Sequence, residues 1–139
     1  MSLSRETRVV AGVTLLAVPT IVYGGLTLLG VLTSGTAGIT PRGLALNETQ
    51  WALFRAGHAH AGVWTVLSLV IQVLLDSATL PPVLKWLARV AAPLAGVAVS
   101  GGFFGLAFGA GFRWLVYFGG VCLVLAVLLT GTGLLRRAR

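Results

Sequence analysis

Residues 114–135 read WLVYFGGVCLVLAVLLTGTGLL, an apolar run without a charged side chain. A helix needs about 20 apolar residues to cross the hydrocarbon core of a bilayer, so this run is long enough to span a membrane. Three further apolar runs with few charges precede it, at residues 9–32, 51–75 and 83–110. A soluble fold could not hide this much apolar surface from water. The sequence therefore predicts a multi-pass membrane protein.

The composition agrees with this prediction. Of the 139 residues, 57% are hydrophobic and 9% are charged, whereas a soluble domain carries roughly 25% charged residues. The mean hydropathy is +0.97. We expect one domain over residues 1–139, an all-α integral membrane four-helix bundle. The polar connection at 33–50 is long enough to fold as a lid over one end, with plain disorder as the equal alternative.

Basic residues are distributed unevenly between the two sides of the predicted bundle. Lys and Arg collect in cytoplasmic loops, which also explains the net charge of +7 without a nucleic-acid partner. With the N-terminus inside, the cytoplasmic side holds Arg5, Arg8, Lys85, Arg89, Arg136, Arg137 and Arg139, and the outer side holds Arg42, Arg55 and Arg113. We therefore predict that both termini are cytoplasmic and that the protein lies in the cytoplasmic membrane.

Both histidines of the chain lie near the start of the second run, in Arg55-Ala56-Gly57-His58-Ala59-His60-Ala61-Gly62. Ionisable side chains at membrane depth are costly and mark candidate functional sites. Side chains two apart on a helix point about 200° away from each other, so His58 and His60 cannot both ligate one metal ion. On the helix face of His60, the side chains before it are small and those after it, such as Trp64, are bulky. A flat apolar ligand could lie beside the histidine on such a face. The alternative is that both histidines only form hydrogen bonds within the bundle.

Glycine is frequent in the third run, where Gly101, Gly105 and Gly109 recur every four residues. One interpretation is close helix packing through small residues. The other is a flat slot in which a planar cofactor lies against the backbone, with phenylalanines such as Phe104 as its walls.

The segment Ala59-His60-Ala61-Gly62 resembles the Ala-His-Ser-Gly motif of the styrene oxide isomerase family, which are small four-helix membrane proteins that bind haem b as homotrimers. The resemblance implies haem b as cofactor, His60 as the iron ligand, a homotrimer and a small apolar epoxide as substrate. Ferric haem then acts as a Lewis acid on the epoxide oxygen. We expect the cofactor site to comprise His60, His58, Arg55, Trp64, Gly101, Phe104 and Gly105.

Two positions depart from the family pattern. The family's asparagine six residues after the histidine falls on Val66, and its helix-three tyrosine falls on or beside Phe104. Both family residues position the substrate, so haem binding carries over better than isomerisation. The alternatives are a non-catalytic haem- or metal-binding membrane subunit that carries electrons or senses a gas, and a structural four-helix membrane protein.

Single introduced cysteines test the predicted orientation. A cysteine near Gly38 should react with an impermeant thiol reagent added outside intact cells, and a cysteine near Ser77 should not react. The opposite pattern would reverse the orientation and place both histidines in the cytoplasmic half of the bilayer.

Overall fold

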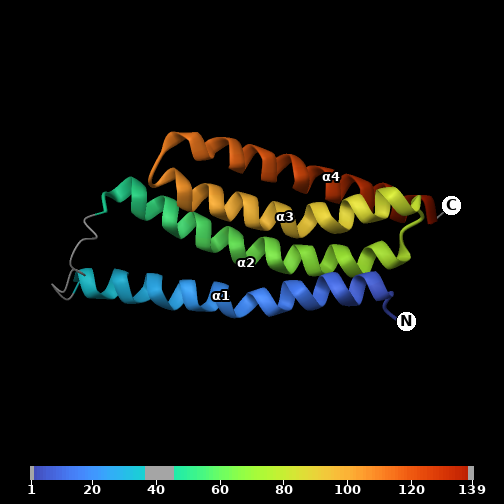
Figure 1. Cartoon of the computed structure of the whole chain (residues 1–139), viewed down its shortest axis with the longest axis horizontal. Coiled ribbons are helices and arrows are strands. Elements are labelled where there is room, and N and C mark those ends of the chain that lie inside the picture. Colours follow the sequence, from blue (N-terminus) through green and yellow to red (C-terminus); the bar gives the residue numbers. More distant parts are fainter. Residues whose placement is uncertain (1, 37–45, 138–139) are drawn as a thin grey trace.

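The computed structural model describes residues 2–36 and 46–137, which form a bundle of four long helices (Figure 1). The helices are α1 (Arg5–Thr36), α2 (Glu48–Ser77), α3 (Pro82–Leu106) and α4 (Arg113–Arg137), with a short 3-10 turn η1 (Ala110–Phe112) before α4. Each long helix contains a segment long and apolar enough to cross a membrane. The prediction of an all-α bundle with four candidate spans is therefore confirmed for the described residues.

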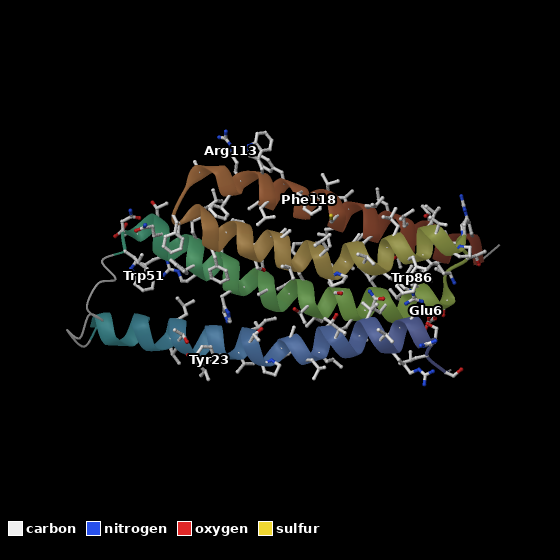
Figure 2. The ribbon with its side chains drawn as sticks, viewed as in Figure 1. Glu6, Tyr23, Trp51, Trp86, Arg113 and Phe118 are labelled. Carbon is white, nitrogen blue, oxygen red and sulfur yellow. The ribbon has the colours of Figure 1, made fainter. Side chains whose placement is uncertain are left out.

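The helices run alternately up and down, and both termini lie at the same end of the bundle (Figure 1). We call this the termini end and the opposite end, where α2 begins, the histidine end. Trp51 and Arg113 lie near the histidine end and Glu6 and Trp86 near the termini end (Figure 2). Tryptophans at both ends are typical of the aromatic belts of membrane proteins.

The helix α2 begins at Glu48, earlier than the predicted Trp51, because a capping box precedes it. The Asn47 side chain accepts a hydrogen bond from Gln50 N at 2.9 Å, and the Gln50 side chain accepts one from Asn47 N at 3.0 Å. Gln50 Nε2 also donates to Ala107 O at 2.8 Å. One side chain thus starts α2 and ties it to the end of α3. Residues 37–45 of the expected lid lie outside the described residues.

The helix α3 ends at Leu106 and not at the predicted residue 110. Phe108 N and Gly109 N both donate to Gly105 O, at 2.8 and 3.0 Å, which closes a turn. Gly109 is extended, with φ of −174°. The predicted stripe of Gly101, Gly105 and Gly109 on one helix face is therefore wrong, since Gly109 lies beyond the helix.

Close packing of α3 against α4 depends on Gly102 and Gly119. A methyl group placed on Gly102 would lie 2.9 Å from Val116 N, and one on Gly119 would lie 2.9 Å from Val99 N. Backbone atoms cannot move aside as side-chain tips do, so both positions need glycine. Small residues let helix backbones approach in this way.

A cluster of polar side chains is buried between α1, α2 and α3 at the termini end. Arg89 is 4% exposed, and its Nη2 lies 2.7 Å from Asp76 Oδ1. Arg89 Nη1 donates to Thr7 Oγ1, and Asp76 also accepts from Thr7 Oγ1 at 2.9 Å and from Ser4 N at 3.0 Å. Arg89, which the sequence analysis counted with the cytoplasmic-side charges, is thus a buried, paired cation.

Gln72 completes this cluster and compensates for a proline in α3. Pro93 has no N–H, so it cannot donate to the Arg89 carbonyl one turn earlier. Gln72 Nε2 donates to that carbonyl instead, at 2.9 Å. Gln72 is fully buried, and its backbone carbonyl lies 3.1 Å from Thr7 Oγ1, whose single proton is shared between this carbonyl and Asp76 Oδ1. The cluster therefore satisfies both the charge of Arg89 and the backbone group that Pro93 leaves free.

Exchange of Gly102 for alanine should destabilise the bundle by about 1–3 kcal/mol through overpacking. Gly101→Ala is the matched control on the adjacent residue, because its methyl group would lie 3.8 Å from Leu115 Cδ2, an ordinary contact. Both free energies can be measured by reversible SDS unfolding in mixed micelles, followed by far-ultraviolet circular dichroism. Equal stability of the two variants would contradict the proposed contact between α3 and α4.

Removal of the Asp76 carboxylate from the buried pair should lower the free energy of unfolding by more than the Gly102 exchange does. Asp76→Asn leaves the Arg89 charge buried without a counterion, and we expect a loss of about 3–5 kcal/mol in the same assay. Lys85→Gln is the control, since this cation on α3 has no ion-pair partner among the described residues and should change stability by less than about 1 kcal/mol. The double variant Asp76→Leu with Arg89→Met should recover part of the loss. A double variant less stable than Asp76→Asn would show that the pair itself does not set the effect.

Candidate functional site

The two histidines of α2 face different neighbours, as their spacing predicts. A methyl group placed on Gly25 of α1 would lie 2.7 Å from His58 Cε1 and Nε2, so the His58 ring occupies the space that this glycine leaves. The His60 ring packs instead on Phe103 of α3, with the ring centres 4.8 Å apart and the planes inclined by 35°. His58 thus lies towards α1 and His60 towards α3.

The protonation pattern of His60 follows from one hydrogen bond. His60 Nδ1 lies 2.7 Å from Ala56 O, one turn earlier on the same helix. A carbonyl oxygen can only accept, so Nδ1 carries the proton and the lone pair of the neutral ring lies on Nε2. Ligating histidines are commonly held in this way through their second nitrogen. His60 therefore has Nε2 as its basic nitrogen.

The surroundings of His60 are aromatic and apolar. The Trp64 ring lies 5.9 Å from the His60 ring, centre to centre, one turn further along α2. Ala56 is half-buried, whereas Ala59 and Val63 are exposed on the outside of the bundle. The half-buried His60 ring thus lies at the edge of an outward-facing surface of small apolar side chains.

His58 lines a cavity of about 340 Å³ at the histidine end, between α1 and α2. Its walls are largely apolar and aromatic, and Phe54 and Phe104 lie 5.6 Å apart, centre to centre. The lining residues are Tyr23, Gly24, Thr27, Leu28, Leu46, Trp51, Phe54, His58 and Phe104. His60 does not line this cavity, so the two histidines belong to separate environments.

The structure brings together only part of the site predicted from the sequence. Trp64 lies beside His60, but Phe104 does not, since its ring covers Gly57 and lines the His58 cavity. The aromatic neighbour of His60 from α3 is Phe103, which the sequence analysis did not select. The pair Phe103-Phe104 was visible in the sequence, and the rotation of α3 decides which of the two meets His60.

The glycines of the expected planar slot, Gly101 and Gly105, face α4 and the short turn η1 before it. A methyl group on Gly105 would clash with the Phe112 ring of η1, and one on Gly101 would meet Leu115 of α4. Side chains of the same chain thus cover both glycines. This favours the packing interpretation, and we leave Gly101 and Gly105 out of the candidate site. Arg55 is exposed on α2 and has no ion-pair partner in the described part of the chain.

A metal site with several protein ligands is not found within residues 2–36 and 46–137, where no three His, Cys, Asp or Glu residues lie together. Haem iron has different needs, since four ligands come from the porphyrin and a single histidine is enough to hold it. The tautomer of His60 and its apolar surroundings fit such a group. A haem at this residue would lie on the outside of the protomer, where Ala59 and Val63 are exposed.

The fold thus defines the chain as an all-α protein with four helices able to span a membrane. Comparisons with protein-family models, curated proteins and solved structures found no match. The functional argument consequently rests on the residues themselves.

Proposed function

We propose that this chain is a haem b-binding membrane protein in which His60 Nε2 is the axial ligand of the iron. The observation that carries the proposal is the 2.7 Å contact between His60 Nδ1 and Ala56 O, which leaves Nε2 as the basic nitrogen. Iron binds a neutral imidazole through the ring nitrogen that carries the lone pair. Phe103 supports the ring from α3.

The oligomer is part of this proposal. His60 is half-buried at the outside of one chain, so a second copy is needed to cover a haem there. The resemblance to styrene oxide isomerases points to a homotrimer. Arg55 is exposed about 7.5 Å nearer the start of α2, at five residues of roughly 1.5 Å each. Its side chain points about 140° away from His60 around the helix, so it would not meet a haem propionate on the His60 face of the same chain.

A single axial ligand favours an enzyme over an electron carrier. Low-spin electron carriers hold iron from both sides, as in cytochromes with Met and His ligands. His58 cannot supply the second ligand from the same chain, because its ring lies against Gly25 of α1. The second face of a haem on His60 would then be open to a substrate.

The proposed reaction is the isomerisation of a small apolar epoxide to a carbonyl compound. When bound, ferric haem supplies a Lewis acid for the epoxide oxygen. The chain contributes apolar walls from Phe103 and Trp64, which exclude water that would otherwise open the epoxide to a diol. Val66 is 63% exposed and Phe104 faces the other cavity, so neither replaces the family's positioning groups beside His60.

We also propose that the termini end faces the cytoplasm and that the protein lies in the cytoplasmic membrane. Arg89 is buried and paired, so it no longer counts as a loop charge. Among the described residues, five other basic residues lie at the termini end and two at the histidine end, which still supports this orientation: Arg5, Arg8, Lys85, Arg136 and Arg137 against Arg55 and Arg113.

The paired variants His60→Ala and His58→Ala test the haem site. His60→Ala should lose the Soret absorbance because no other histidine lies on that face. The variant should still insert into the membrane and fold. His58→Ala removes an imidazole of the same size two residues away and should keep the absorbance. Visible spectra of the purified proteins, normalised to protein concentration, provide the measurement.

The wild-type spectrum separates the remaining alternatives. A five-coordinate ferric spectrum, with conversion of styrene oxide to phenylacetaldehyde that His60→Ala abolishes, supports the isomerase. A six-coordinate spectrum without turnover supports a carrier or sensor. Haem retained in His60→Ala and lost in His58→Ala would move the ligand to the α1 side, and a wild-type protein that never contains haem would refute the proposal.

A further inference from the structure

A second cavity lies midway along the bundle, between α1, α2 and α3. Its volume is about 290 Å³, and its lining residues are Val13, Thr14, Ala17, Thr20, Ile21, Ala61, Trp64, Thr65, Ser68, Pro93, Gly96, Val97 and Ser100. No charged side chain is among them. Val13 and Val97 are 66% and 72% exposed, so the cavity borders the outer surface of α1 and α3. In a bilayer this surface would face the lipid chains.

Three buried polar atoms without a hydrogen-bond partner belong to side chains that line this cavity. They are Trp64 Nε1, Ser68 Oγ and Ser100 Oγ. Ser68 is 1% exposed and Ser100 is 6% exposed. Buried hydroxyl and indole groups in native proteins nearly always have a partner, so three exceptions around one cavity require an explanation.

Two threonines that line the same cavity donate their hydroxyl protons to backbone carbonyls of their own helices, as is usual in membrane helices. Thr14 Oγ1 donates to Val10 O at 2.8 Å, and Thr65 Oγ1 donates to Ala61 O at 2.7 Å. Ser68 and Ser100 make no such bond to their own helices. Their hydroxyl protons are therefore free to be donated to a molecule in the cavity.

We propose that this cavity binds a small, mostly apolar molecule that carries one oxygen acceptor, such as a ketone, an ether or an epoxide. The three donors belong to residues of α2 and α3 that line the cavity, and the indole N–H of Trp64 can only donate, so the ligand must accept. The walls are otherwise apolar, and the lack of a charged lining residue excludes ions. The ligand reaches the cavity from the lipid, between α1 and α3.

The volume limits the size of this ligand. Ligand pockets typically measure roughly 300–1,000 Å³, so a cavity of about 290 Å³ accepts one or two rings and not a long lipid. His60 does not line the cavity, although Trp64 borders both places. The inference thus goes beyond haem binding and would stand without it.

Photolabelling with benzophenone tests this inference directly, because its ketone is both the acceptor and the reactive group. Full-length protein in detergent micelles is irradiated at increasing benzophenone concentration, and labelled peptides are mapped by mass spectrometry. We expect saturable labelling at cavity residues such as Val97, and unsaturable labelling at Val121, an equally exposed valine on α4. Acetophenone should compete, whereas ethylbenzene, which has the same shape without the acceptor, should compete weakly.

Removal of the hydroxyls should weaken this labelling. Ser68→Ala and Ser100→Ala should each raise the half-saturating concentration roughly threefold to tenfold, the value of one neutral hydrogen bond. Thr130→Val is the control, since this buried hydroxyl of α4 already donates to Ala126 O at 2.7 Å, away from the cavity. Ala17→Phe, on the exposed side of α1, should abolish saturable labelling without burial of a new polar group.

Labelling that never saturates in the wild type would overturn the proposal. An unchanged half-saturating concentration in the Ser68→Ala, Ser100→Ala double variant, or equal competition by acetophenone and ethylbenzene, would also overturn it, because the acceptor would then contribute nothing.

Discussion

The ion pair between Arg89 and Asp76 constrains most of this fold. A guanidinium buried to 4% exposure is tolerated only when nearly all its donors are used, and here an acid, two hydroxyls and a glutamine surround it. Those groups come from α2 and from α1 with the residue just before it, whereas Arg89 belongs to α3. The charge can therefore be satisfied only when the three helices have the right register and rotation. The pair therefore specifies the arrangement of the bundle as well as its stability.

The same constraint explains the uneven packing of α1. Among its described side chains up to Gly30, only Thr7 and Thr14 are buried, and Thr7 belongs to the polar cluster. Further along, α1 lies on α2 through the His58 ring at Gly25, and it makes no contact with α4 in the described residues. A helix held firmly at one end and loosely beyond it leaves room for the two apolar cavities that α1 helps to line.

The sequence predicted the number and type of helices, because hydropathy over long segments averages out local detail. It was less successful where single side chains decide. The sequence placed Arg89 in the third apolar run, among the charges of the cytoplasmic side, but neither its burial nor its pairing with Asp76 can be known before the helices are packed. Phe104 was chosen in place of Phe103 because the rotation of α3, set by the contact of Gly102 with Val116, is a tertiary property. The capping box at Asn47 and Gln50 was readable from the sequence and shows that α2 starts earlier than hydropathy suggests.

Hydrogen-bond satisfaction separates the structural polar groups of this protein from the functional candidates. Arg89, Asp76, Gln72 and Thr7 bond to one another across three helices, so their main role is to hold these helices together. His60 uses Nδ1 within its own helix and keeps Nε2, and Ser68, Ser100 and Trp64 keep unused donors around a cavity. In a bilayer each unmet polar group is costly, because lipid cannot supply a partner. A bound molecule that supplies the missing partner therefore best explains the unpaired polar atoms of His60, Ser68, Ser100 and Trp64.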